Sequence, residues 1–168
     1  MKGKTLIIWC IFRDSISRLA SALEARGVKV CSVYGEIPLD ERQQILSAFK
    51  NGRFQVLITN PHTLAESVSL HTVCHDALSF EYSYNLVHLL QSKDRIHRLG
   101  LRDGQYTQYS YLQLTYTTED GPWSMDEEVF LRLKAKEQTM LNAIDKQILE
   151  TLPTTEEDLD LIFNKLKM

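Results

Sequence analysis

The stretch TLIIWCIFRDSISRLASALEARGVKVCSVY, from Thr5 to Tyr34, decides the fold. It opens with a continuous apolar and largely β-branched run, which predicts a strand buried on both faces. Its middle places Ile16 and Leu19 on one helical face, and Gly27 is suited to end that helix. A second strand-like run closes the stretch. Strand, helix and strand with short connections predict two parallel strands covered by a helix.

The same alternation continues beyond Tyr34 to about residue 117. The run IPLDERQQILSAFKNG predicts a helix that ends at Gly52. The first helix is expected to be capped by Asp14 or Ser15. The second helix is expected to turn three apolar side chains inward: Leu39, Leu46 and Phe49. The remaining expected elements are strands at 54–60, 76–82 and 107–117, and a helix at about 85–99.

These elements predict an α/β fold with three layers, in which a mainly parallel sheet is flanked by helices. In such sheets the functional loops follow the carboxyl ends of the strands. Three loops therefore draw attention, and they follow Phe12, Tyr34 and Asn60. Trp9 lies in the middle of a strand, which favours a core position over a base-stacking role.

The last fifty residues differ from this pattern. We expect residues 1–118 to form the α/β lobe and residues 119–168 to form a helical extension. EDGPW reads as a turn, and long helices are expected to open with Ser124/Glu127 and Thr154/Glu157 capping boxes. The first of these helices carries an apolar stripe of Leu133, Met140, Leu141, Ile144 and Ile148. Such helices either pack on the lobe or on each other, or they form a docking surface for a missing partner segment.

Composition bounds the function. The chain has 168 residues and a formal net charge of −3, so any nucleic-acid contact must come from a local patch. Cys10, Cys31 and Cys74 are scattered and form no CxxC pair, which favours a reducing, cytoplasmic compartment. His71 and His75 lack further ligands with suitable spacing, so no metal site is expected. The start MKGKTLIIWC reads as neither a signal peptide nor a membrane span, and no membrane partner is expected.

The segment QSKDRIHRLGL, Gln91 to Leu101, concentrates cations on an otherwise acidic chain. On a helix, Gln91, Arg95 and Arg98 would share one face, and Asp94 would lie beside Arg98. Two guanidiniums and an amide on one stripe suit a ligand with several phosphate groups. The alternative is a solvated helix end, where arginine is favoured by the helix dipole.

QSKDRIHRLGL resembles motif VI of superfamily 2 helicases, in the form found in Swi/Snf-type translocases. Three further stretches resemble that family in the same order: KTLIIWCIFRDSISRLASAL resembles motif IV, VYGEIPLDERQQILSAFKNG the next conserved block with Gly35 and Arg42, and VLITNPHTLAESVSLH motif V. DEEVFLRLKAKEQ resembles the helix that usually follows this lobe. The resemblance spans about residues 4 to 140. It implies the second RecA-like lobe of a two-lobed, ATP-driven motor.

The resemblance also implies roles for individual residues. Arg95 and Arg98 match the family's catalytic arginine fingers. The nucleotide and the inter-lobe cleft are expected to be contacted by Gln91, Asp94, Glu66, Ser67 and Ser69. The nucleic-acid backbone is expected to be contacted by Asn60, His62 and Thr63. One departure stands in motif V, where relatives are glycine-rich and this chain reads Ala-Glu-Ser-Val-Ser over residues 65–69.

The sequence has no GxxxxGK[ST] phosphate loop and no DExx-type acidic motif. The resemblance therefore implies ATP and Mg²⁺ held mainly by a first lobe outside this chain, and a chain that is inactive alone and belongs to a longer motor. The expected partners are that first lobe and DNA, in double-stranded form. Two alternatives stay open. The chain is either a non-catalytic RecA-like module that binds nucleic acid or protein with a decayed nucleotide site, or an unrelated flavodoxin-like domain.

Overall fold

The computed structural model describes residues 4–65, 69–97, 105–119, 121–146, 154, 156–157 and 159–160. The chain divides into two compact units, of which the first contains residues 1–81 and 87–112 and the second contains residues 82–86 and 113–168. Whether they behave as domains divided at residue 118 stays a prediction.

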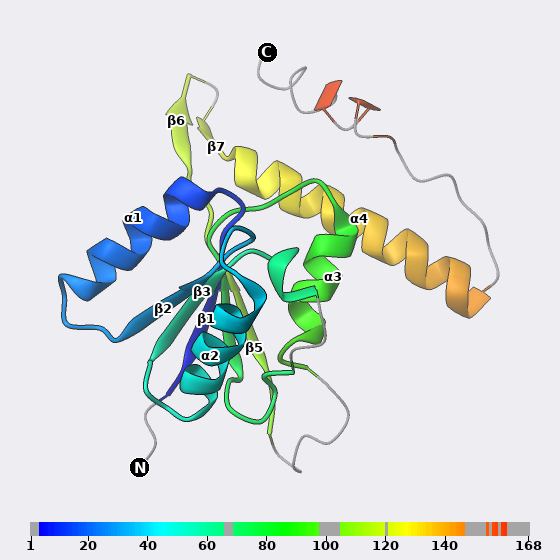
Figure 1. The fold of residues 1–168 in the computed structure, drawn as a ribbon. Helices are drawn as coiled ribbons and strands as arrows, with labels where there is room; N and C mark the ends of the chain where they lie inside the picture. The colour runs from blue at the N-terminus through cyan, green and yellow to red at the C-terminus, as the bar shows by residue number, and fades with distance from the viewer. Residues whose placement is uncertain are drawn as a thin grey trace. The chain divides into compact units, whose positions relative to one another are not determined.

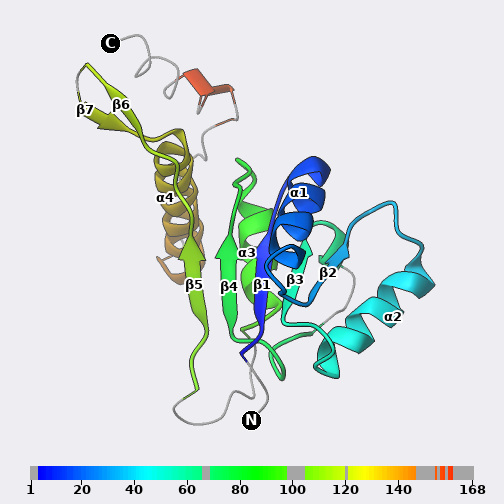
Figure 2. The same ribbon diagram turned by 90° about the vertical axis from the view of Figure 1, so that its left-hand side faces the viewer.

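The first unit is built on a five-stranded sheet with the order β2-β3-β1-β4-β5 (Figures 1 and 2). Its strands are β1 (Leu6–Trp9), β2 (Val30–Val33), β3 (Val56–Thr59), β4 (Asp76–Ser79) and β5 (Gln108–Tyr111). Every neighbouring pair is parallel. The central strand β1 aligns Ile7 with Leu57 of β3 on one side and with Ala77 of β4 on the other. The predicted parallel α/β sheet is confirmed.

Side chains from the strands form two cores, one on each face of the sheet. Alternate residues of a strand point to opposite faces, so Ile7 and Trp9 enter one core while Ile8 and Cys10 enter the other. The first core is covered by α2 (Leu39–Lys50), and the second is covered by α1 (Arg13–Glu24) through Ile16. This is the predicted three-layer arrangement. Trp9 is 2% exposed, which confirms its core position.

Glycines end both of these helices as predicted. Gly27 and Gly52 have φ values of +79° and +77°, a left-handed conformation that glycine adopts without the steric penalty of a β-carbon. The inward face of α2 was predicted less well. Leu46 and Phe49 are buried, but Leu39 is 54% exposed because it is the first residue of the helix and precedes the buried face.

The helix α3 (Leu86–Asp94) is shorter than the sequence indicates. The expected helix to residue 99 is wrong, because Arg95 and Ile96 lie in a turn. Their carbonyl groups accept hydrogen bonds from outside the helix: Arg95 from the backbone N–H of Leu70 at 2.9 Å, and Ile96 from the hydroxyl of Thr107 at 3.2 Å. Gln91 therefore lies on the helix and Arg95 follows it, so the two residues do not form a continuous helical stripe.

The second unit contains a β-hairpin and a long helix. The hairpin pairs β6 (Tyr116–Thr118) with β7 (Gly121–Trp123), so the expected strand at 107–117 is two strands and EDGPW includes a strand. Gly121 has a φ of +120° at this hairpin, a value that favours glycine. The helix α4 runs over Met125–Lys146. In the described chain no helix is long and apolar enough to cross a membrane.

Residues of both predicted capping boxes form hydrogen bonds in this unit. The hydroxyl of Ser124 accepts the N–H of Glu127 at 3.2 Å, in the first turn of α4. The carboxylate of Glu157 accepts the N–H of Thr154 at 2.7 Å, and the hydroxyl of Thr154 accepts the N–H of Glu157 at 3.3 Å. The predicted stripe on α4 is only partly buried. Leu133 is 2% exposed, whereas Leu141 and Ile144 face solvent. Ile148 lies outside the described residues.

Candidate functional site

The loop after β3 carries the three residues expected to contact a nucleic-acid backbone. Asn60 accepts the N–H of Thr63 through its side-chain oxygen at 2.8 Å, which begins the short helix η1 (Thr63–Ala65). His62 is exposed, and its ring meets His88 of α3 edge-on with centroids 6.1 Å apart. The structure therefore brings Asn60, His62 and Thr63 together at the carboxyl edge of the sheet.

The loop after β2 lies beside this one. A β-carbon added at Gly35 would stand 3.9 Å from the hydroxyl oxygen of Thr63, so the two loops are in van der Waals reach. Arg42 of α2 fixes the β2–α2 loop, because its guanidinium donates to the carbonyls of Gly35 and Ile37 at 2.6 Å each. The pairing of Gly35 with Arg42 gives the loop a defined shape next to the loop after β3.

The loop after β1 is held by Glu81, a residue that the sequence analysis did not single out. The Glu81 carboxylate accepts the backbone N–H groups of Ile11 and Phe12 at 2.8 and 2.9 Å, and it also accepts the hydroxyl of Ser15. Neither Asp14 nor Ser15 caps α1, and Phe12 is the N-cap residue with no side-chain hydrogen bond of its own. The predicted cap was wrong because a carboxylate 69 residues later in the chain takes that place.

The position of Glu81 follows from the strand order. Chain connections leave β1 towards β2 and leave β4 towards β5, so they diverge between these two neighbouring strands. Open α/β sheets bind ligands at such a point, beyond the carboxyl ends of the strands. Here the N–H of Phe80 donates to the carbonyl of Trp9 at 2.9 Å, and Glu81 follows directly. The chain's own carboxylate therefore occupies the N-terminus of α1.

A second group of predicted residues gathers at the far end of α3. Ser69 shares a hydrogen bond with His71, and the next residue, Leu70, donates its N–H to the carbonyl of Arg95. A backbone hydrogen bond therefore connects the end of the motif V stretch to the middle of the motif VI stretch. Thr5 precedes β1 and donates to the carbonyl of Val73 at 2.5 Å, so this group lies near the amino edge of the sheet.

Arg95 is 9% exposed, and its Nε atom is buried without a hydrogen-bond partner in the described part of the chain. Removing a lone guanidinium from water costs on the order of several kcal/mol. An anionic partner offsets this cost, so a buried arginine is strongly stabilised by one. Gln91 is half-buried and Asp94 is exposed on the same segment. This group therefore offers one buried, incompletely bonded cation to an anion.

A residue of β5 holds the end of α3 in place. The hydroxyl of Tyr109 donates to the carbonyl of Lys93 at 3.1 Å. Burial, together with the nearby Tyr111 and Asp94, raises the pKa of Tyr109 to about 12. Tyr109 therefore remains a protonated donor over the physiological pH range. The three other predicted residues, Arg98, Glu66 and Ser67, lie outside the described residues.

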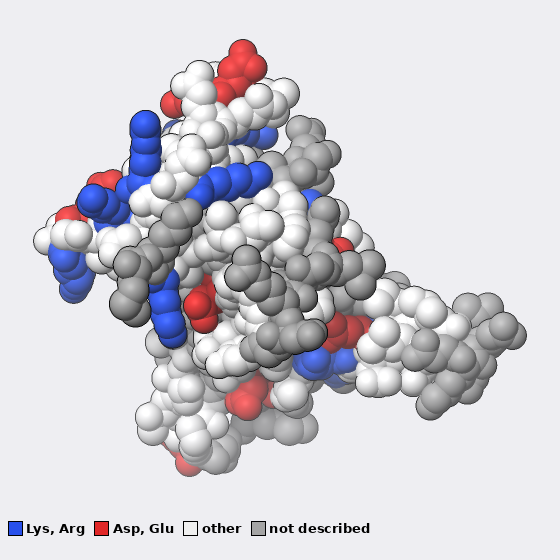
Figure 3. Space-filling model, turned by 90° about the horizontal axis from the view of Figure 1, so that it is seen from below, with Lys and Arg blue, Asp and Glu red and all other residues white. Residues whose placement is uncertain are grey.

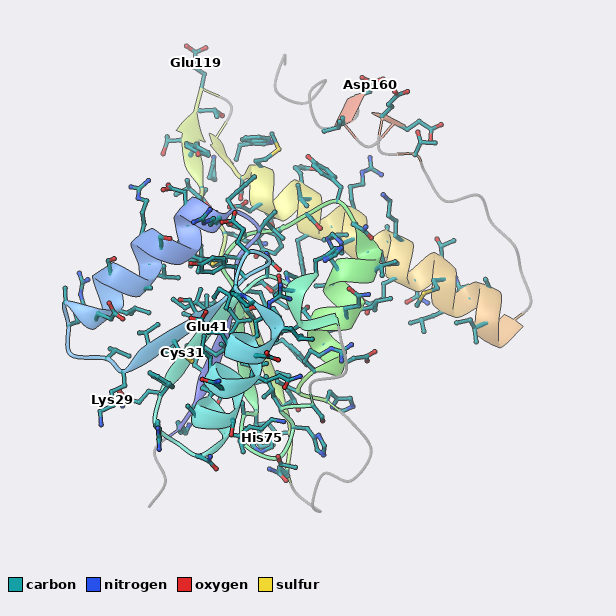
Figure 4. All side chains as sticks on the ribbon, in the orientation of Figure 1. Lys29, Cys31, Glu41, His75, Glu119 and Asp160 are labelled. Carbon is teal, nitrogen blue, oxygen red and sulfur yellow. The ribbon has the colours of Figure 1, made fainter. Side chains whose placement is uncertain are left out.

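The amino edge of the sheet carries a hollow of about 770 Å³. Lys4, Lys29 and Lys50 line it together with Asp76 and His75, and Figure 4 shows Lys29 and His75 at the amino ends of β2 and β4. Figure 3 views the molecule from this side and shows basic and acidic side chains interspersed. Cations are therefore also present far from the carboxyl-edge loops.

The residues fit only part of an ATP–Mg²⁺ complex. Arg95 provides a cation suited to phosphate oxygens. Within the described ranges, no cluster of three or more His, Cys, Asp or Glu side chains could hold a metal ion.

A family model described as "Helicase conserved C-terminal domain" matches residues 1–100. The chain is 30% identical over 115 residues to an ATP-dependent RNA helicase DBP3 of Lodderomyces elongisporus, covering 68% of this chain and 20% of that protein. It is 24% identical over 132 residues to an ATP-dependent RNA helicase DBP5 of Mycosarcoma maydis, covering 77% and 28%. The chain thus spans less than a third of these curated relatives.

The fold is similar to a solved structure titled "Crystal structure of the C-terminal part of Fun30 ATPase domain". The TM-score is 0.69 at 20% identity, and the match covers 98% of this chain and 48% of that one. At this identity the likeness concerns the fold, which is that of a RecA-like lobe.

Proposed function

This chain belongs to the helicase conserved C-terminal domain family, the second RecA-like lobe of superfamily 2 helicases, and from that premise we propose that it serves an ATP-driven nucleic-acid motor. In this proposal the chain supplies Arg95 and Arg98 to an ATP site that a first lobe completes. Gln91, Asp94, Glu66, Ser67 and Ser69 line the nucleotide and the cleft between the lobes. The carboxyl-edge loops contact the nucleic acid.

The observation that carries the nucleotide half of the proposal is the state of Arg95. Its Nε is buried and has no hydrogen-bond partner in the described residues. The carbonyl of the same residue accepts the backbone N–H of Leu70. An anion that enters from outside would satisfy this donor, and the phosphates of ATP have the right charge. When bound, ATP supplies the phosphoryl group and Mg²⁺ offsets its charge. This chain's part is to orient a guanidinium towards that group.

The nucleic-acid half rests on the loops after β2 and β3. Asn60 orders its loop by accepting the N–H of Thr63, and Arg42 orders the neighbouring loop. Partly exposed polar groups on two adjacent, hydrogen-bonded loops suit contacts to sugar and phosphate, which position a protein without reading sequence. His62 is exposed and adds a donor on the same edge.

A second candidate is a non-catalytic RecA-like module that binds nucleic acid or protein. The sequence of residues 65–69 favours it, because motif V of relatives is glycine-rich and this stretch contains no glycine. Side chains restrict backbone conformations that glycine allows. The two candidates differ in one respect that can be measured, which is ATP turnover.

The test joins this chain to a first lobe that carries a phosphate loop and measures ATP hydrolysis. We expect negligible hydrolysis by this chain alone, and turnover by the joined protein that rises with nucleic acid. Robust hydrolysis by the isolated chain would contradict the proposal. A joined protein that binds nucleic acid but hydrolyses no ATP would favour the non-catalytic module instead.

The same ATP hydrolysis assay identifies which nucleic acid stimulates the joined protein. The form of motif VI leads us to propose double-stranded DNA, whereas the names of the curated relatives point to RNA. Duplex DNA, single-stranded DNA and RNA are therefore compared at equal nucleotide and salt concentration, because phosphate contacts make binding salt-dependent. Stimulation only by RNA would overturn the duplex-DNA part and leave the motor proposal standing.

A further inference from the structure

We propose that Phe12 stacks on an unpaired base of the bound nucleic acid, so that the carboxyl edge of this lobe contacts a single strand. This inference rests on the motor part of the proposed function and departs from its duplex-DNA part, because it adds a contact to an unpaired base to what would otherwise be backbone contacts. Its basis is an exposed aromatic residue whose backbone is fixed by hydrogen bonds at the point where the chain connections of β1 and β4 diverge.

Phe12 is 65% exposed although it is a large apolar residue at the carboxyl end of a buried strand. Its backbone is nevertheless fixed. The N–H of Phe12 donates to Glu81 at 2.9 Å, and its carbonyl accepts the N–H of Ile16 at 3.2 Å in the first turn of α1. A ring on a fixed backbone loses little conformational entropy when it binds a flat partner.

Glu81 also decides what kind of contact can form here. A helix N-terminus ordinarily attracts phosphate, because its free N–H groups point outward. The carboxylate of Glu81 already accepts the N–H groups of Ile11 and Phe12, and its negative charge repels a second anion. The α1 N-terminus is therefore closed to a phosphate group, and the aromatic face of Phe12 remains as the available contact.

Arg13, the next residue along the chain, adds a cation at the start of α1. Its guanidinium lies over the ring of Tyr34 at 5.3 Å and pairs with Glu36. Both partners of that ion pair are more than half exposed, at 58% and 64%, so water weakens the pair and a phosphate can replace Glu36. An aromatic face for a base with a neighbouring cation for the backbone is the usual arrangement in proteins that bind single strands.

The test measures binding of fluorescent oligonucleotides to the joined two-lobed protein at low salt. Two oligonucleotides of equal length are used: a natural single strand and one that keeps the sugar-phosphate backbone but lacks bases. The variants are Phe12→Leu, which keeps an apolar side chain without the ring, and Phe12→Trp, which keeps a ring. Because the side chain of Phe12 is largely exposed, both variants are expected to fold.

Phe12→Leu is expected to weaken binding of the natural strand by about tenfold and to leave the abasic strand unchanged, since stacking on one base is worth about that much. Phe12→Trp should retain binding. The control is Tyr106→Leu, because Tyr106 is an aromatic residue with 78% exposure that lies before β5, at the opposite edge of the sheet.

The other results are equally informative. If Phe12→Leu binds the natural strand as the wild type does, the stacking inference is wrong and the motor proposal is untouched. Equal weakening on natural and abasic strands would mean that Phe12 supports the loop and does not stack, which also overturns the inference. A wild-type protein that binds no nucleic acid would contradict the proposed function itself.

Discussion

At the scale of single residues, Glu81 fixes the loop after β1. It is a half-buried carboxylate that accepts two backbone N–H groups and one hydroxyl from the β1–α1 loop. A cap normally comes from the residue next to the helix. Here it comes from the neighbouring strand, so the start of α1 depends on the pairing of β1 with β4.

We predict that Glu81→Ala lowers the free energy of unfolding by about 1–3 kcal/mol, because the backbone N–H groups of Ile11 and Phe12 lose a charged acceptor. Urea unfolding should show a lower midpoint with an unchanged slope. Glu36→Ala is the matched control, since Glu36 forms an exposed ion pair with Arg13 and should change stability by less than about 1 kcal/mol. Equal effects of the two substitutions would refute the capping role.

The cysteines give a second prediction at this scale. Burial raises the pKa of Cys10 and of Cys31 to about 12, and burial also raises the pKa of Cys74. The three thiols should therefore resist iodoacetamide at pH 8 in the folded protein and react quickly in urea, because the thiolate is the nucleophile. Rapid labelling of the native protein would contradict this.

The same pKa values fix the direction of a stability change with pH. Because the folded-state values lie above the unfolded value of about 8.5, these thiols favour the folded state below that pH. The unfolded chain loses thiol protons first as the pH rises. Their contribution to the free energy of unfolding should therefore decline from about pH 8.5 towards pH 12. Replacing all three by alanine should flatten that part of the curve.

At the scale of elements, the sheet was predictable and the helix ends less so. The apolar runs at β1, β2 and β3 are long enough to identify buried parallel strands without any tertiary information. The end of α3 depends on Leu70 and Thr107, which bind the carbonyls of Arg95 and Ile96 from distant parts of the chain. No local pattern indicates such bonds, so a continuous helix was the natural expectation.

Some residues in the loops of the candidate site were predictable from the sequence, and others were not. Asn60, His62 and Thr63 were found from the motif and lie together. Glu81 and Phe12 were missed as a pair because their contact joins residues 69 positions apart. The parallel pairing of β1 with β4, once assumed, would have placed the residues after both strands side by side.

Arg42 offers a prediction about an element boundary. Its guanidinium donates to Gly35 and Ile37, so Arg42→Ala should release the β2–α2 loop and speed amide exchange around Ile37, whose N–H donates to the carbonyl of Tyr34. Exchange in β2 itself should stay slow, because its ladder with β3 is unaffected. Arg42→Lys should not rescue the loop, since lysine lacks the fork geometry. Unchanged exchange in Arg42→Ala would show that the loop is held by other contacts.

At the scale of the whole molecule, the two predicted groups of site residues lie apart. Asn60, His62 and Thr63 lie at the carboxyl edge of the sheet, and Ser69 and Arg95 lie at the other end of α3. A protein that binds two different ligands needs two such surfaces. This separation is what we expect of a lobe that contacts nucleic acid on one side and a nucleotide on another.

The most direct test of the account is ATP turnover by the two-lobed protein carrying Arg95→Ala or Arg98→Ala. We predict that kcat falls by about a thousandfold in each variant, because an arginine finger offsets charge in the transition state. Arg53→Ala, an exposed arginine beyond the end of α2, should leave kcat unchanged. Circular dichroism establishes that each variant is folded, and Arg98→Ala carries the test if Arg95→Ala does not fold. Full turnover by folded variants at both positions would contradict the central claim.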